Sequence, residues 1–303
     1  MTPLFSCHDL SITIPGRTLV EALSFEAGAG ELLAVLGQNG SGKTLTMHTL
    51  AGLRTAPQGR VMLRGADLAA SRRQDIARQL ALLPQHIDDI FPATVLDTAM
   101  IGRHPHIGRF EWESPEDFVI GRSALASVGL DGLAGRDILT LSGGERRRLA
   151  IAQVLTQQPD VYLLDEPTNH LDPQHQLDAL RLFREKADEG ATVIASLHDV
   201  NLAVRYADRC LLLYGDGQWD IGASADCFWP GRSPAEGRRS IRGIDANPVH
   251  PVSSSSSWSE STDGVIASRT NASPVPAMSP SSRPMARFCL LYTSDAADDR
   301  PRV

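Results

Sequence analysis

A glycine-rich stretch constrains this chain more than any other feature: Gly37-Gln38-Asn39-Gly40-Ser41-Gly42-Lys43-Thr44. It fills every fixed position of the pattern G-x-x-x-x-G-K-[ST], follows an apolar run and precedes a helical pattern. Glycines let the backbone wrap closely around phosphates, and the following helix directs its amino-terminal dipole at the same anion. The pattern therefore favours a nucleotide-binding loop over an ordinary glycine turn, with Lys43 reaching the β- and γ-phosphates and the Thr44 hydroxyl ligating Mg²⁺.

Composition divides the chain after residue 226. Residues 1–226 carry 20 basic and 29 acidic residues, whereas residues 227–303 carry 9 and 7 and hold 9 of the 19 prolines. The first part is long enough to bury a sizeable core, and the second is predicted to be a disordered tail. Because Cys289–Asp299 resembles the translation of a sequencing-library adapter, we interpret the tail as the product of a reading-frame error and adapter sequence, with a genuine disordered tail as the alternative.

Charge, hydropathy and cysteine spacing exclude several classes. The net charge of −7 argues against a general nucleic-acid binder. No apolar run approaches the roughly 20 residues of a membrane span, and no secretory signal opens the sequence. The four cysteines form neither a disulfide framework nor a metal-ligand pattern. We therefore expect a soluble body with no nucleic-acid partner.

The order of apolar segments predicts an α/β fold. Val161–Leu164 and Thr192–Leu197 are apolar strands that each precede a helical stretch, and Leu32–Leu36 has the same form. Strands that alternate with helices favour a parallel sheet. Between Gln85 and Ser142 the pattern turns mostly helical, which predicts an inserted helical subdomain.

Two adjacent acids follow one of these strands. Asp165 stands where a carboxylate would hold the Mg²⁺ shell, and Glu166 could polarise an attacking water as a general base. A strand followed by an acidic turn is the alternative for this motif alone. Together with the phosphate loop, the two acids indicate a nucleotide phosphohydrolase or a kinase.

A third motif narrows the class: Leu141-Ser142-Gly143-Gly144-Glu145. It precedes a helix, so Ser142 can cap that helix and free amide groups can face an anion. With the phosphate loop before it and the two acids after it, the chain resembles the ATP-binding-cassette (ABC) family, whose signature is this pentapeptide. The resemblance implies an α/β fold in residues 1–226: a P-loop NTPase (RecA-like) parallel-sheet core, an N-terminal antiparallel β-subdomain and a helical subdomain at about residues 86–158.

The resemblance also implies roles for residues whose types alone say little. Gln85 matches a glutamine that touches Mg²⁺ and water and senses a transmembrane partner, Asp172 ends a loop that crosses a dimer interface, and His198 matches a histidine that contacts the γ-phosphate. Catalysis would rest on Glu166, His198 and Lys43. The implied assembly is a head-to-tail homodimer in which each signature faces the nucleotide held by the other phosphate loop.

The same resemblance defines the expected ligand contacts. ATP would contact the phosphate loop, Gln85, the signature and Asp172, and Mg²⁺ would be held by Thr44, Gln85 and Asp165. One position departs from the family pattern, because Ile14 stands where an aromatic residue usually stacks on adenine. We expect weaker adenine discrimination there, with binding retained.

Other segments resemble one importer branch. Gly102-Arg103-His104-Pro105 and His198–Ala203 are similar to ATPases of iron-siderophore, haem and cobalamin uptake systems. The resemblance implies an ATPase at the cytoplasmic face of the inner membrane that drives separate polytopic permease subunits and works indirectly with a periplasmic substrate-binding protein. Cobalamin or a ferric siderophore is favoured slightly over haem as cargo.

Three alternatives stay open at this point. The chain could be a soluble regulatory or repair ABC ATPase without a membrane partner, or a P-loop kinase. The run Arg146–Arg148 could also indicate nucleic acid, but we favour a solvated helix face after the signature.

Overall fold

The computed structural model describes residues 3–86, 92–108 and 110–227, so all but the first residue of the predicted tail lies outside the described residues. The strands are β1 (Phe5–Ile14), β2 (Arg17–Ala27), β3 (Leu32–Gly37), β4 (Gln58–Leu63), β5 (Ala66–Asp67), β6 (Leu80–Leu83), β7 (Val161–Asp165), β8 (Thr192–Ser196), β9 (Arg209–Leu213) and β10 (Trp219–Ala223). The α-helices are α1 (Lys43–Leu50), α2 (Arg73–Gln79), α3 (Val95–Met100), α4 (Pro115–Ser127), α5 (Gly143–Gln157), α6 (Pro173–Asp188), α7 (Val200–Tyr206) and α8 (Ser224–Cys227). Four short 3-10 helices are η1 (Leu68–Ala70), η2 (Ile101–His106), η3 (Asp131–Leu133) and η4 (Ile138–Thr140).

The central sheet has the strand order β10-β9-β3-β8-β7-β6. Strands β9, β3, β8, β7 and β6 run parallel, and only β10 pairs antiparallel. Successive side chains of β3 enter two different cores: Ala34 packs with residues of α5 and α6, whereas Leu33 and Val35 pack with α1 and the N-terminal strands. A parallel sheet covered on both faces requires apolar residues along the whole strand, which explains the continuous apolar runs.

A second sheet has the order β2-β1-β4-β5 and is antiparallel throughout. Helix α1 contacts β1 of this sheet and also β3, β7 and β8 of the central sheet. The parallel core and the N-terminal antiparallel sheet confirm the predicted fold class.

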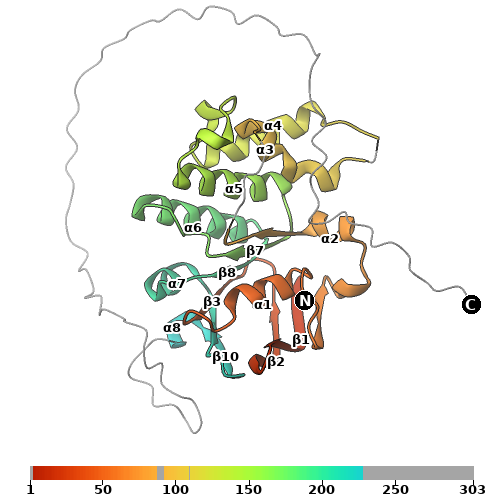
Figure 1. Ribbon diagram of the computed structural model, residues 1–303, viewed down its shortest axis with the longest axis vertical. Helices are drawn as coiled ribbons and strands as arrows, with labels where there is room; N and C mark the ends of the chain where they lie inside the picture. Colours follow the sequence, from red (N-terminus) through yellow and green to blue (C-terminus); the bar gives the residue numbers. More distant parts are fainter. Residues whose placement is uncertain (1–2, 87–91, 109, 228–303) are drawn as a thin grey trace, which may run out of the picture.

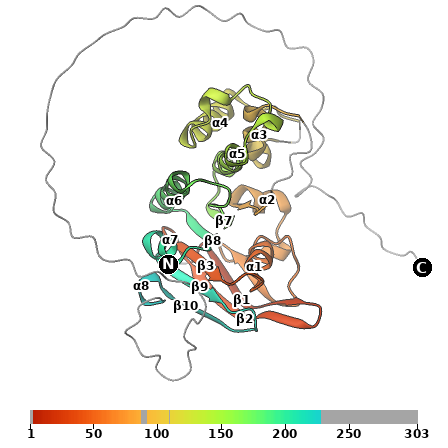
Figure 2. The ribbon, with the colours of Figure 1, turned by 60° about the vertical axis from the view of Figure 1, so that its left-hand side comes forward.

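Helices α3, α4 and α5 form a separate group at the end of the molecule opposite β1 and β2 (Figures 1 and 2). Helix α5 connects this group to the core, because the Gln157 side chain donates to the carbonyl oxygens of Ala77 and Leu80. The group is the inserted helical part that the sequence predicts. Within the described ranges, none of the helices combines the length and hydropathy needed to cross a membrane.

Candidate functional site

The phosphate loop joins the end of β3 to the start of α1. A Cβ atom on Gly37 would lie 2.4 Å from both the Leu213 carbonyl oxygen and Ser41 Oγ, so the chain needs glycine there. Gly42, the last residue before α1, has a φ of 101°, which also favours glycine. Lys43 is buried, and its Nζ donates to the Gly37 carbonyl oxygen at 2.9 Å. The backbone of the phosphate loop therefore holds the Lys43 amine close to the loop.

The outer turn of this loop is formed by Gln38, Asn39 and Gly40, which are exposed. The Gln38 carbonyl oxygen accepts from the Ser41 amide at 3.1 Å and from Lys43 Nζ at 3.5 Å. Within the described residues, Ser41 Oγ is buried and has no hydrogen-bond partner. Burial lowers the pKa of the Lys43 amine, and the neighbouring carboxylates of the β7 end oppose that shift.

The two acids lie at the carboxyl end of β7, on the same edge of the sheet as the phosphate loop, because β3, β8 and β7 are parallel. Asp165 is fully buried, and its Oδ1 accepts from Ser196 Oγ at 2.7 Å. The same hydroxyl accepts from the Glu166 amide at 2.8 Å. Glu166 has a φ of 49°, a left-handed conformation that is strained for a residue with a side chain. Surrounding contacts must therefore hold it in place.

The Glu166 carboxylate is the centre of the site. Gln85 Nε2 donates to its Oε2 at 2.7 Å, Asn169 Nδ2 donates to the same oxygen, and His198 Nε2 lies 2.5 Å from Oε1. Gln85 also accepts from Thr44 Oγ1 at 3.4 Å, which connects the cluster to the phosphate loop. Side chains from three separate segments of the sequence thus meet at one buried carboxylate, and Gln85 connects them to Thr44 in a fourth.

Three oxygens at this edge of the sheet suit a hard cation. Thr44 Oγ1 and Gln85 Oε1 lie side by side, and Asp165 Oδ2 is buried without a hydrogen-bond partner in the described part of the chain. An unpaired buried carboxylate oxygen is costly, and oxygen ligands of this kind are those that Mg²⁺ prefers. The donor set therefore fits a magnesium ion.

The signature begins helix α5. Ser142 is the N-cap: its Oγ accepts from the Glu145 amide at 3.2 Å, while Glu145 Oε2 accepts from the Ser142 amide at 2.7 Å. Hydrogen bonds from the Ser142 amide and side chain to the carboxylate hold the pKa of Glu145 below its usual value. Leu141 is buried beneath the cap, and the exposed Gly143 starts the helix. Among the described residues, none of the hydrogen bonds or ion pairs joins residues 141–145 to the phosphate loop.

The signature lies beside the loop that leads to Asp172. A Cβ on Gly144 would lie 3.4 Å from the carbonyl oxygen of His170, in the loop that leads to Asp172. Asp172 is the N-cap of α6 and accepts from the His175 amide at 2.9 Å and from the His175 ring at 2.8 Å. Those hydrogen bonds hold the pKa of Asp172 below its usual value. The structure thus gathers the phosphate loop, Gln85, the two acids and His198, but not the signature or Asp172.

Ile14 is the last residue of β1 and is 37% exposed. It lies at the turn between β1 and β2, outside the Glu166 cluster. The expected effect of this residue on adenine binding stays a prediction.

Sequence reasoning missed three residues of the site. Ser196 bridges the two acids, and its signal was a hydroxyl at the end of an otherwise apolar strand, two residues before His198. Asn169 contacts Glu166, although its loop was interpreted only as a dimer contact. Arg147 is 3% exposed and donates to the carbonyl oxygens of Asp165 and Glu166.

The prediction of a solvated arginine face is therefore wrong for Arg147, whereas Arg146 and Arg148 are half-buried. Arg146 donates to the carbonyl oxygens of Leu139 and Leu141, and Arg148 donates to that of Val128. Three consecutive side chains on a helix point in three different directions. Here each of the three arginines donates to backbone carbonyl oxygens that accept no hydrogen bond within a helix.

Comparisons with known proteins agree with this geometry. The ABC transporter family matches residues 20–169. The chain is 43% identical over 217 residues to the hemin import ATP-binding protein HmuV of Deinococcus radiodurans, which covers 70% of this chain and 81% of the relative. It is 36% identical over 227 residues to the achromobactin transport ATP-binding protein CbrD of Dickeya dadantii, covering 75% and 84%. An ABC transporter solved in an inward-facing conformation matches with a TM-score of 0.65 and 29% identity, covering 76% of this chain and 86% of that one.

Proposed function

The chain belongs to the ABC transporter family, and on that premise we propose that it is the ATP-hydrolysing subunit of an importer that takes up a metal chelate. Activity as a transport ATPase follows from the family. The import direction and the cargo class are supported by relatives named for hemin and achromobactin. The cargo class therefore includes haem and ferric siderophores, and it also includes cobalamin, since a relative from Halobacterium salinarum that is 36% identical over 223 residues is named for cobalamin import.

The observation that carries the hydrolytic role is the buried Glu166 carboxylate at the edge of the phosphate loop. Its oxygens face amide and imidazole donors, which orient the carboxylate to accept a proton from water. Lys43 lies where its charge offsets that of the nucleotide phosphates, and His198 stands beside the base to contact the terminal phosphate. The backbone amides of residues 38–44 bind the remaining phosphate oxygens.

Mg²⁺ fits the oxygen cluster described above, and Thr44, Gln85 and Asp165 would hold it. When bound, the ion neutralises charge on the phosphate oxygens. Asp165 is kept in place for this role by the Ser196 hydroxyl, which leaves its second oxygen unpaired.

The position of the signature supports a homodimer. Since Ser142, Gly143 and Gly144 make no polar contact with their own phosphate loop in the described ranges, they are free to face the nucleotide of a second copy in a head-to-tail homodimer. We place Asp172 at the same dimer interface. Permease subunits would bind the helical part at about residues 86–158, at the cytoplasmic face of the membrane, with a periplasmic binding protein delivering the chelate from the other side.

Hydrolysis of Mg-ATP by the purified chain tests the catalytic part of this proposal. Glu166→Gln should lower turnover by at least about 100-fold while ATP still binds, and ATP should then trap a dimer detectable by light scattering. The matched control is Glu185→Gln on the exposed face of α6, which should hydrolyse ATP at the wild-type rate. Turnover of Glu166→Gln at the wild-type rate would remove Glu166 from the role of base.

Co-expression with a permease tests the transport part. The expected result is co-purification with a polytopic membrane protein and ATP-dependent uptake of an iron chelate into vesicles. ATP hydrolysis without any permease binding would favour the soluble regulatory or repair alternative instead.

A further inference from the structure

Arg147 makes an unusual set of contacts for a charged side chain. It lies on α5, five residues after the N-cap Ser142, and is 3% exposed. Its Nη1 donates to the Pro84 carbonyl oxygen at 2.6 Å, and its Nε donates to that of Pro167 at 3.2 Å. Its Nη2 donates to two more carbonyl oxygens, those of Asp165 at 2.8 Å and Glu166 at 2.7 Å. One guanidinium thus binds four backbone oxygens.

These four oxygens surround the catalytic cluster. Pro84 immediately precedes Gln85, and the other three belong to the consecutive peptide units on both sides of the Glu166 side chain. Among the described residues, Arg147 forms no ion pair within 4.0 Å, so hydrogen bonds to carbonyl dipoles, together with the nearby charges of Asp165 and Glu166, compensate for the burial of its charge. The planar, five-donor guanidinium is the side chain best suited to bind several oxygens in a fixed geometry.

Glu166 depends on such support because of its strained backbone. Its amide is held by Ser196 and its carboxylate by neighbouring side chains, but its carbonyl is held by Arg147 and the Asn169 amide. A non-glycine residue in the left-handed region keeps that conformation only when its surroundings determine it. Without the guanidinium, the two peptide units that flank Glu166 and the unit after Pro167 each lose a hydrogen bond.

We propose that Arg147 is a positioning residue for ATP hydrolysis, which fixes the peptide units around Glu166 and ties them to the helix that begins at the signature. This rests on the proposed role of Glu166 as the general base. A small rotation of α5 would move the guanidinium together with the signature. Arg147 thereby makes the placement of the base sensitive to whether the signature of the same subunit is engaged.

The test compares Arg147→Met and Arg147→Lys with Arg148→Met, the matched control. Arg148 is the next residue on α5 and donates to carbonyl oxygens of Val128 and Gly129, far in sequence from Glu166. Arg147→Met should lower kcat by about 10- to 100-fold, because a base displaced by a fraction of an ångström loses that much, while KM for ATP changes less than about 3-fold. Arg147→Lys keeps the charge and should recover part of kcat, and Arg148→Met should retain the wild-type kcat.

Thermal unfolding of each variant separates positioning from folding. A folded Arg147→Met enzyme with wild-type kcat would overturn the proposal, whether or not its KM for ATP rises. Arg147→Lys as slow as Arg147→Met would also contradict a role for the charged donor. If Arg147→Met does not fold, Arg147→Lys decides alone: the proposal requires a kcat below wild type at an unchanged KM. Failure of the proposed function would look different, because wild type would not hydrolyse ATP or Glu166→Gln would remain fully active.

Discussion

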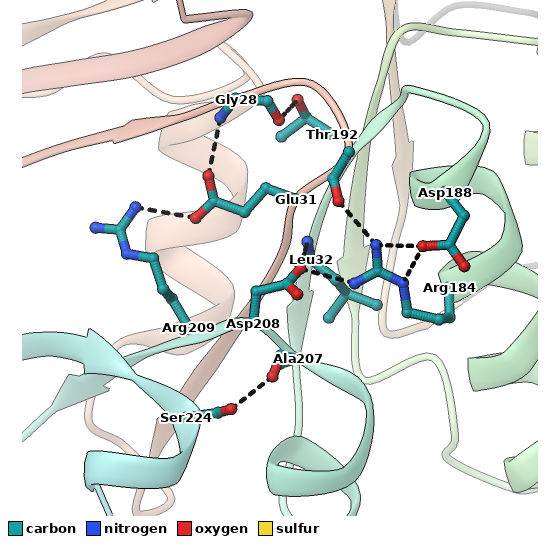
Figure 3. A network of polar contacts seen from close by, with 11 residues as sticks. Gly28, Glu31, Leu32, Arg184, Asp188, Thr192, Ala207, Asp208, Arg209 and Ser224 are labelled. Atoms are coloured by element: carbon teal, nitrogen blue, oxygen red, sulfur yellow. Dashed lines mark hydrogen bonds and ion pairs between the residues drawn. The ribbon is translucent and has the colours of Figure 1, made fainter.

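At the carboxyl ends of β3, β7 and β8, polar side chains converge on Glu166, and two buried oxygens, Ser41 Oγ and Asp165 Oδ2, have no partner in the described residues. At the amino ends of β3, β8 and β9 the polar groups drawn in Figure 3 bind one another. The buried Tyr206 hydroxyl, two residues before Asp208, is a further group without a partner in the described residues. Asp208 accepts from the Leu32 amide at 2.8 Å and from Arg184 at 2.7 Å.

The amino-end network continues across the sheet. Arg184 also donates to the Gly30 carbonyl oxygen, and Arg209 donates to Glu31, whose other oxygen accepts from the Gly28 amide. None of the side chains labelled in Figure 3 is among the buried groups that lack a partner in the described residues.

The difference between the two ends indicates where this sheet can bind a ligand. Satisfied hydrogen bonds and ion pairs stabilise the fold but leave nothing to bind, whereas unpaired buried oxygens cost free energy that a bound group can recover. The left-handed Glu166 lies at the same end, although five other described non-glycine residues, Gln158 before β7 among them, also have a positive φ. Substitutions at the carboxyl end should therefore act on turnover, and those at the amino end on the free energy of unfolding.

Lys43→Met should give the largest effect. Loss of the cation from the phosphate loop should lower ATP turnover by more than about 100-fold, equivalent to about 2.7 kcal/mol. Stability should not fall, because burial already lowers the pKa of this amine and a thioether avoids the desolvation of a charge. ATP hydrolysis and thermal unfolding check the two parts.

The second lysine provides the control. Lys186 lies on α6 and pairs with Glu189 at the surface, so Lys186→Met should leave turnover unchanged. If Lys43→Met lowers stability but leaves turnover per folded molecule unchanged, the expectation that carboxyl-end substitutions act on turnover would be wrong.

Asp208→Ala should give the next largest effect, at the amino end. It leaves the buried Leu32 amide unpaired, which should cost about 2 kcal/mol of unfolding free energy with kcat unchanged. Asp188→Ala is the matched control: its carboxylate binds the same Arg184 but accepts from no backbone amide in the described residues, so it should cost less than about 1 kcal/mol. Urea unfolding measures both, and equal losses would mean that the Leu32 amide is not the decisive contact.

Removing either of two hydroxyls on β8 tests the contrast between the carboxyl and amino ends within one strand. Ser196, at the carboxyl end, bonds to both acids of the site, whereas Thr192, at the amino end, donates to the Gly28 carbonyl oxygen at 2.6 Å. Ser196→Ala should lower kcat by about 5-fold, or about 1 kcal/mol, by loosening the acids.

Thr192→Val keeps the shape of the side chain and removes only the hydroxyl. It should lower the free energy of unfolding by about 1 kcal/mol and leave kcat intact. A kcat loss in Thr192→Val equal to that in Ser196→Ala would show that the two ends are not independent.

The carboxyl end was predictable from sequence because its chemistry lies in fixed spacings. The residues Gly37–Thr44 and Asp165–Glu166 each end a buried strand, and parallel strands bring their carboxyl ends together. The fold class followed from the same alternation of strands and helices. These inferences need only local patterns and a topological rule.

Contacts that depend on packing were not predictable. Arg147 resembles its two neighbours in sequence, and only the path of α5 past β7 makes it the buried one. The ion pair between Arg184 and Asp208 joins α6 to the residue before β9, and no spacing rule predicts such a pair. A run of arginines in the sequence therefore cannot show which of them binds the backbone carbonyl oxygens of the site.

Ile14→Tyr should give the smallest effect, at the outer edge of the carboxyl end. An aromatic ring in place of an exposed aliphatic side chain adds stacking at the low end of its usual range, about 0.5 kcal/mol, so the Kd for ATP should tighten by about 2-fold. Ile14→Leu is the control and should leave the Kd unchanged. Inorganic triphosphate has no base to stack, so its Kd should not change in either variant. Equal tightening for ATP and triphosphate would show that the ring acts on the phosphate loop rather than on adenine, and the nucleotide base would then contribute nothing at this position.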